Sequence, residues 1–181
     1  MRKPRPLMPS PAGRGDATAT RTLPALRLFR LISGAVRAHY ARIEAESGVP
    51  AAEVRLLAAI AEPGGEGVDR LAARLALHKS TVSNLAGKLV RKRLALRERA
   101  AGDLRSVRLS VSPAGRALLR RAPQPAGGLM QTILEGLTPS ELRQVEEALQ
   151  LLAGRLPPGM DRYARQSLTA DVPAKEEGGK E

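Results

Sequence analysis

The chain has 181 residues, about the size of one ordinary domain with tails, and its apolar fraction of 43% is enough for a hydrophobic core. With 30 Lys and Arg against 18 Asp and Glu, the formal net charge of +12 favours a polyanionic partner, nucleic acid first and an acidic membrane surface second. The absence of Cys excludes disulfides and thiol redox switches, and it fits a cytoplasmic location. No stretch approaches the roughly 18 apolar residues of a membrane span, and the basic N-terminus lacks the apolar core of a signal peptide.

Most of the excess positive charge lies in one stretch of the chain. Lys79–Arg121 holds twelve basic side chains and two acidic ones, Glu98 and Asp103, while the remainder is nearly neutral. A charge run of this kind is commonly a solvated face, so the pattern around it has to identify the partner.

Both ends of the chain lack hydrophobic periodicity. Residues 1–22 are rich in Pro, Gly, Arg and Thr, and residues 158–181 are polar with little to bury. We predict that both are disordered tails around one domain at 23–157. The basic N-terminal arm could touch phosphate, but an idle tail is the favoured interpretation.

Three helices are predicted in the first part of this domain. Apolar residues recur at helical spacing over Leu23–Ser47, and Gly48 supplies a stop. Pro50 suits the first position of a second helix, which runs to the Pro-Gly-Gly break at 63–65. Residues 68–75 carry a short third helix.

A fourth helix, KSTVSNLAGKLVRKR, follows a three-residue turn at 76–78. One of its faces is apolar. Two short helices around a tight turn, the second small and polar at its N-terminal end and basic later, are typical of a helix-turn-helix. The opposite, polar face carries Ser80, Thr81, Ser83, Asn84, Lys88 and Arg91.

A β-hairpin is predicted next, because apolar residues alternate on both sides of the glycine in AAGD. Its basic face includes Arg97 and Arg108. The loop holds Gly102, Asp103 and Arg105, so we expect Arg105 near the tip, the part of the hairpin that can reach farthest into a groove. The predicted apolar face consists of Leu94, Leu96, Val107, Leu109 and Val111.

Two more helix starts follow the hairpin. Ser112 is the expected N-cap of a helix with proline in its first position, and this helix should stop near Ala122, where APQPAGG begins. After a brief apolar stretch, Thr138 with Glu141 predicts the start of a last amphipathic helix that runs up to Pro157.

Over roughly Leu26–Leu156 the chain resembles the MarR family of bacterial winged-helix transcriptional regulators. The resemblance rests on the order of elements and on three motifs: LAARLALHKSTVSNLAGKLVRKRL, GDLRSVRLSVS and SPAGRALL. It implies a mainly α fold with a small β-wing, in which a winged helix-turn-helix at about 68–112 is flanked by dimerisation helices. It also implies a homodimer whose first and last helices interlock.

In the resembled family the recognition helix enters the major groove and the wing lies beside the minor groove. The resemblance therefore implies that Arg105 is the wing arginine and that Asp103 holds it, which a charge-assisted hydrogen bond can do. Asn84 is the best candidate to read a base edge, because an amide pairs bidentately with adenine. The competing interpretation of the small polar residues is helix capping and solvation. The implied contacts on the recognition helix are Ser80, Thr81, Ser83, Asn84 and Lys88, while Arg91, Arg97 and Arg108 meet phosphate or solvent.

Three positions depart from the family pattern. Arg93 stands where the family often has glycine, and Gly87 lies inside the recognition helix, where it costs about 1 kcal/mol relative to alanine. The proline-rich break at Pro123, Pro125 and Gly127 interrupts a helix that is commonly continuous, which leaves its effect on dimer geometry open.

Other kinds of site have little support in the sequence. His39 and Tyr40 lie on the first helix, where the resembled family forms an effector pocket, but packing is the favoured interpretation of both. His39 and His78 are the only histidines, and without Cys or a carboxylate cluster they predict no metal site. No grouping of nucleophile, acid and base is present, so we expect no catalytic residues, no cofactor and no enzymatic activity.

The predicted function is that of a sequence-specific regulator that binds double-stranded DNA. We expect a repressor that acts as a homodimer on a pseudo-palindromic operator with half-sites about one helical turn apart. A small-molecule effector, if there is one, would release this repressor from the operator. The alternative is a non-specific architectural nucleic-acid-binding protein, which would bind scrambled DNA equally well. The sequence identifies neither the operator nor the regulated genes.

Overall fold

The computed structural model describes residues 16–62, 67–100, 103–160 and 164, and it describes side chains for all of these except 16–21, 99–100 and 103–107. Helices and one two-stranded antiparallel sheet make up this part of the chain, so the predicted fold class is confirmed. In chain order the elements are α1 (Asp16–Ser47), α2 (Ala51–Ala61), α3 (Val68–Leu75), α4 (Lys79–Arg91), β1 (Ala95–Ala100), β2 (Asp103–Val111), α5 (Pro113–Arg121), α6 (Leu129–Glu135) and α7 (Pro139–Ala153).

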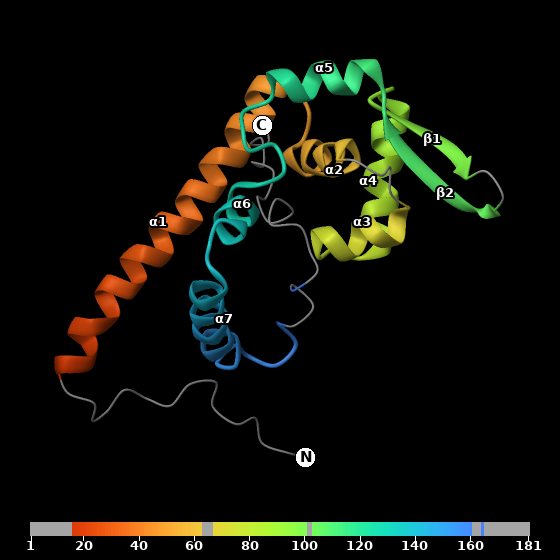
Figure 1. Cartoon of the computed structure of the whole chain (residues 1–181). Coiled ribbons are helices and arrows are strands. Elements are labelled where there is room, and N and C mark those ends of the chain that lie inside the picture. Colours follow the sequence, from red (N-terminus) through yellow and green to blue (C-terminus); the bar gives the residue numbers. More distant parts are fainter. Residues whose placement is uncertain (1–15, 63–66, 101–102, 161–163, 165–181) are drawn as a thin grey trace, which may run out of the picture.

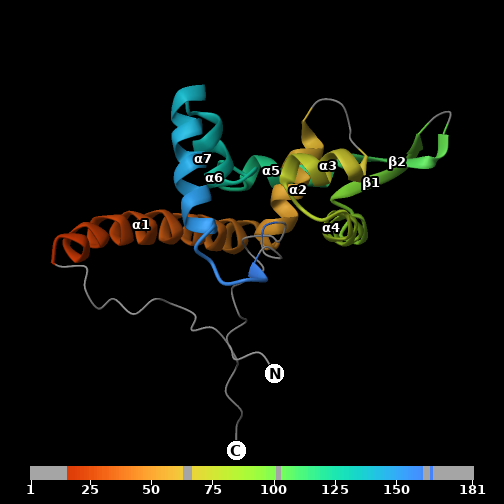
Figure 2. The same ribbon diagram turned by 90° about the horizontal axis from the view of Figure 1, so that it is seen from below.

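The elements form an elongated molecule with a compact unit at one end (Figure 1). Helices α2, α3 and α4 pack together beside the hairpin, whose two strands project outward. Helix α5 leads from the base of the hairpin back to the C-terminal end of α1. Figure 2 shows that α1 reaches far from the compact unit and that α7 stands across the direction of α1.

Helix α2 is the centre of the hydrophobic core. Its sequence, AAEVRLLAAIA, is apolar almost all round, which is the pattern of a helix covered on every side. Helices α3 and α4 and strand β2 pack around it. The fully buried apolar side chains of this core include Val54, Leu56, Leu57, Leu71, Val82, Leu89 and Leu109.

The first helix is longer than predicted. Helix α1 begins at Asp16, so residues 16–22, which the sequence analysis placed in a disordered tail, are helical. Periodicity missed them because the segment DATATRT holds no apolar residue larger than alanine and so carries no apolar stripe. Residues 1–15, and residues 161–181 apart from Ala164, lie outside the described part of the chain.

The predicted apolar face of the first wing strand is wrong. Ala95 pairs with Val111 and Arg97 pairs with Leu109, so Ala95 and Arg97 point to the inner face of the hairpin. Leu96 pairs with Ser110 and is 45% exposed. Leu94 is buried, but it precedes the strand, so the alternation of the strand does not include it. A shift of one residue therefore exchanges the two faces of β1.

The tip of the hairpin is tighter than predicted. Strand β2 begins at Asp103, so the backbones of Asp103 and Arg105 lie in the strand and not in the loop. Arg99 pairs with Val107, whereas Ala100 pairs with Asp103, which leaves residues 104–106 as an irregularity beside the tip. The predicted hydrogen bond between Asp103 and Arg105 falls on side chains outside the described ones.

The start of α5 is locked onto the base of the hairpin. As predicted, Ser112 is the N-cap: its Oγ accepts a hydrogen bond from the Gly115 N–H at 2.9 Å and donates one to the Arg93 carbonyl at 2.7 Å. The Ser112 N–H donates to the Leu94 carbonyl at 3.1 Å. Arg93 has a φ of 58°, in the left-handed region that glycine adopts most easily, which explains why glycine suits this position.

The predicted start of the last helix is confirmed as a capping box. The Glu141 N–H donates to Thr138 Oγ1 at 3.3 Å, and Glu141 Oε2 accepts from Thr138 Oγ1 at 2.7 Å and from the Thr138 N–H at 2.8 Å. The bond from the Thr138 side chain, followed by the bond from its backbone, lowers the pKa of Glu141. At pH values above the ordinary pKa of glutamate, these bonds therefore stabilise the first turn of α7 in full. This stabilisation is lost as the pH falls through the lowered pKa of Glu141.

Candidate nucleic-acid interface

Helix α4 presents one side to the core and the other to solvent. Val82, Ala86 and Leu89 are buried against the neighbouring helices. Of the predicted contact residues on this helix, Thr81 is half-buried, and the others are exposed and lie on the outward side. Four of them follow a spacing of three or four residues, which places them in one stripe along the helix. The exposed residues are Ser80, Ser83, Asn84, Lys88 and Arg91.

The N-terminal end of α4 is suited to an anion. His78 is the N-cap residue but makes no side-chain cap, and the first turn contains no acidic residue. Unpaired backbone N–H groups and the positive end of the helix dipole attract phosphate at such a position. Lys79 Nζ lies 2.7 Å from Asp69 Oδ1 and joins this end to the first turn of α3. Because both side chains are mostly exposed, this ion pair contributes little to the stability of the fold and mainly orients the turn.

The hairpin lies beside α4 and adds positive charge. The side chain of Arg108 is exposed, as predicted. The Arg108 backbone forms an isolated antiparallel bridge with Gly67, which ties the hairpin to the residue before α3 and which the sequence did not predict. Arg97 borders a small cavity together with Ser83 and Gly87 of α4, so its inner position brings this arginine close to the recognition helix.

Sequence reasoning missed an ion pair that fixes the other end of α4. Lys92 Nζ lies 2.7 Å from Glu53 Oε2, and the Glu53 side chain is only 3% exposed. Lys92 therefore neutralises a buried carboxylate of α2 and anchors the C-cap of α4. Glu53, the one acidic residue in the largely apolar α2, was the available signal, because a buried charge requires a partner.

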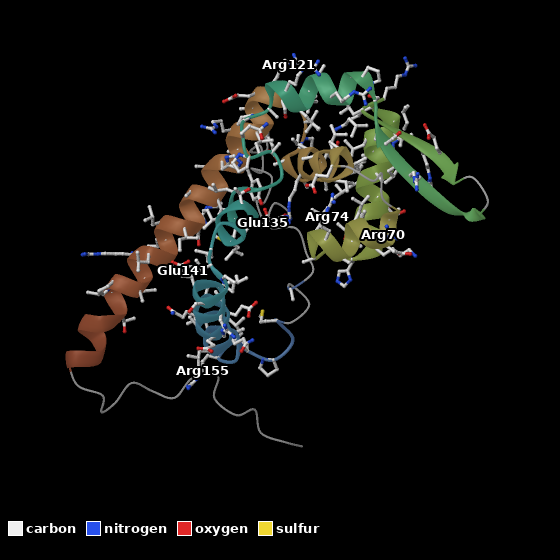
Figure 3. The ribbon with its side chains drawn as sticks, viewed as in Figure 1. Arg70, Arg74, Arg121, Glu135, Glu141 and Arg155 are labelled. Carbon is white, nitrogen blue, oxygen red and sulfur yellow. The ribbon has the colours of Figure 1, made fainter. Side chains whose placement is uncertain are left out.

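Of the two residues predicted as an effector site, Tyr40 borders the cavity next to α6 and His39 does not. His39 is buried, and its Nε2 lies 3.0 Å from the Pro125 carbonyl oxygen, which fits the packing interpretation. Tyr40 borders a cavity of about 400 Å³ together with Arg55 and Arg74 and apolar residues of α6. Figure 3 shows Arg74 on α3 and Glu135 on α6, two of the elements that border this cavity.

The described residues hold neither a cluster of metal-ligating side chains nor a helix that could span a membrane. No group of three or more His, Cys, Asp or Glu side chains there could hold a metal ion. In the same part of the chain, no helix is both long and apolar enough to cross a membrane.

A helix-turn-helix with an exposed polar second helix, followed by a basic β-hairpin, defines the winged helix-turn-helix class of DNA-binding proteins. Residues 47–106 of the chain match the family model described as the MarR family. This segment runs from the end of α1 into β2 and includes all of α2, α3 and α4.

Two solved structures have a similar fold. The complex of S. aureus MepR with DNA is 23% identical, covers 72% of this chain and 96% of that chain, and gives a TM-score of 0.52. The complex of Streptococcus pneumoniae FabT with DNA is 17% identical, covers 74% of this chain and 95% of that chain, and also gives a TM-score of 0.52. A search of curated protein sequences found no match.

The resemblance predicted from the sequence is therefore confirmed for the segment that the family model matches: residues 47–106 are similar to the MarR family, and the fold is that of a winged-helix protein. Proteins of this family are DNA-binding regulators and not enzymes, which agrees with the prediction that the chain has no enzymatic activity.

Proposed function

We propose that the protein is a homodimeric repressor that binds a pseudo-palindromic operator in double-stranded DNA and acts in the cytoplasm. The observation that carries this proposal is the exposed polar stripe of α4 beside a basic hairpin, in a chain whose family match includes α4 and reaches into β2. A protein that occupies a promoter excludes polymerase without any further contact surface, so repression is the simplest outcome. The two similar solved structures are DNA complexes, which supports double-stranded DNA as the partner.

The unpartnered apolar surface of the chain supports the homodimer. On α1, Phe29 is 64% exposed and Leu31 is 66% exposed, and on α7 Leu151 is 70% exposed. Exposed apolar side chains along helices that reach away from the core are typical of an interface between subunits. Association through α1 and α7 would leave α4 and the hairpin of each subunit free for DNA. Other exposed apolar residues of these helices are Leu28, Ile32, Leu149 and Leu152.

The cavity beside Tyr40 supports an effector. Its lining combines apolar side chains with the guanidinium groups of Arg55 and Arg74 and the carboxylate of Glu135, and this excess of positive charge suits a small organic acid. The cavity lies against Leu75 and Ala76, where α3 turns toward α4. A ligand that fits this site better in one orientation of the turn would shift the population of DNA-binding states. Release of bound DNA by small organic acids tests this part of the proposal.

DNA affinity is the direct test, measured by fluorescence anisotropy on the DNA upstream of the protein's own gene and on a scrambled control across a salt series. Asn84→Ala should cost about 1–3 kcal/mol of binding free energy on the native site and little on the scrambled DNA, because it removes a base contact.

Lys88→Ala should weaken binding to both DNAs and lower the salt slope by about 0.9, because it removes a phosphate contact. Arg105→Ala tests the wing and should weaken binding to the native site.

The binding proposal fails if the wild-type protein shows no preference for the native site over the scrambled one and its affinity is insensitive to salt. Equal but salt-sensitive binding to both DNAs would instead favour the architectural alternative, which the family match does not favour.

Leu151→Glu tests the dimer. Because Leu151 is exposed within the chain, the substitution should leave the fold intact, as measured by circular dichroism, but place a charge in the proposed interface. We expect sedimentation to shift from dimer to monomer and affinity for the native DNA site to fall, because the half-sites are no longer bound together. Gln150→Glu places the same charge on the neighbouring exposed residue and is the matched control. A Leu151→Glu protein that remains dimeric would contradict the proposed interface.

A further inference from the structure

The proline-rich break predicted from APQPAGG is a folded connection between α5 and α6, residues 122–128, that docks on two other helices. His39 of α1 bonds to it, and because the Pro125 carbonyl can only accept, His39 Nε2 carries the hydrogen of that 3.0 Å bond. Arg55 Nε of α2 donates to the Gly127 carbonyl at 3.2 Å. The α5–α6 connection is therefore held by side chains from both α1 and α2.

The same arginine also reaches the helix-turn-helix. Arg55 Nη2 lies 3.4 Å from the carbonyl oxygen of Leu75, the last residue of α3, and 3.4 Å from Gln131 Oε1 in α6. Ala76 follows with a φ of 53°, and this left-handed residue turns the chain toward α4. A guanidinium group is planar and carries five N–H donors at fixed angles, so one arginine can hold groups on different elements at once.

The backbone of the α5–α6 connection lies beside this arginine. A Cβ at Gly128 would lie 3.4 Å from Arg55 Nε and 3.5 Å from Tyr40 Oη, which are ordinary van der Waals contacts. Glycine is favoured there by its φ of 120°, which L side chains rarely adopt. With its guanidinium bonded on both sides, Arg55 has little freedom to change its conformation.

We propose that Arg55 is a positioning residue for DNA binding. It joins the end of α3 to the α5–α6 connection and α6, and so sets the orientation of the α3–α4 turn relative to a connection that His39 ties to α1. Two recognition helices can occupy both half-sites only if this orientation is the same in each subunit. Arg55 itself does not touch DNA in this proposal, which rests on the proposed DNA-binding function.

Arg55→Lys is the decisive variant, because it keeps the charge but cannot bond to Gly127, Leu75 and Gln131 together. We expect affinity for the native DNA site to fall about 3- to 30-fold, with a smaller loss on scrambled DNA and an unchanged salt slope, because no phosphate contact is removed. Hydrogen exchange of the Ala76 and Leu77 amides, which bond to α3 carbonyls, should accelerate more than exchange in α2. Arg120→Lys on the exposed face of α5 is the matched control and should change neither measurement.

Three results would overturn the proposal. A lower salt slope would make Arg55 a phosphate contact, and equal losses on both DNAs with a uniform rise in exchange would make it a general stabilising residue. Unchanged affinity and unchanged exchange at residues 76–77 would remove any positioning role. If the wild-type protein itself does not prefer the native site, the proposed function fails together with this inference. A wild-type preference with an unaffected Arg55→Lys protein overturns the inference alone.

Discussion

Replacement of Gly115 by alanine is expected to destabilise the protein by about 3 kcal/mol, the upper part of the range for overpacked sites. A Cβ at this position would lie 2.1 Å from the Leu94 carbonyl oxygen and 2.8 Å from Val111 Cγ1. The helix cannot simply move away, because the Leu94 carbonyl also accepts the hydrogen bond from the Ser112 N–H. Denaturant-induced unfolding followed by circular dichroism measures the loss.

The matched control for Gly115→Ala is the same substitution at Gly87. A Cβ there would meet Arg91 Nη1 at 3.5 Å, which is an ordinary contact. Since Gly87 lies inside α4, alanine should raise the free energy of unfolding by up to about 1 kcal/mol through its higher helix propensity. If both variants changed stability in the same direction, the close approach of α5 to the hairpin would not be the cause.

Lys92→Met is expected to lower the free energy of unfolding by about 3 kcal/mol, because it leaves the Glu53 carboxylate buried without its partner. This is the lower end of the range for breaking a buried pair, since the Lys92 side chain is 42% exposed. The measurement is again equilibrium unfolding. Glu53→Gln removes the charge but keeps the shape, so it should cost less than Lys92→Met.

The double variant Glu53→Met/Lys92→Met distinguishes the ion pair from two independent contributions. Apolar side chains of similar volume can replace a buried ion pair with little net loss, so the double variant should recover most of the stability lost in Lys92→Met. Losses that simply add would contradict the coupling between these two residues. In either case DNA affinity should be measured on the folded variants, since Lys92 anchors the C-terminal end of the recognition helix.

The helix starts were predictable because their signals are local. Ser112 and Thr138 each bond to an N–H three residues ahead, so the sequence spacing contains the whole interaction. The faces of the hairpin were harder. In the sequence, Leu94 and Leu96 alternate with Ala95 as an inward-facing pair would. The strand begins at Ala95, however, so Ala95 and not Leu96 faces inward. Apolar residues on both sides of such a boundary give no signal for its position.

The polar stripe of α4 was also predictable, because helical spacing decides which residues share a face. The interactions that hold this helix in place were not. Glu53 and Lys92 are 39 positions apart in the sequence, and Arg55 bonds to carbonyls of residues 20 and 72 positions away. Nothing in the local pattern of either segment identifies the other.

By itself, the sequence determined the order of the elements, the caps of α5 and α7, the exposed face of α4 and the resemblance to the MarR family. These depend on periodicities and contacts that span a few residues. Only the tertiary structure decided that Lys92 pairs with the buried carboxylate of Glu53 and that Gly115 lies against the Leu94 carbonyl. It also decided that the proline-rich connection is hydrogen-bonded by His39 and Arg55. These depend on contacts between segments far apart in the sequence, where each buried charge or polar group needs a partner that only folding brings near.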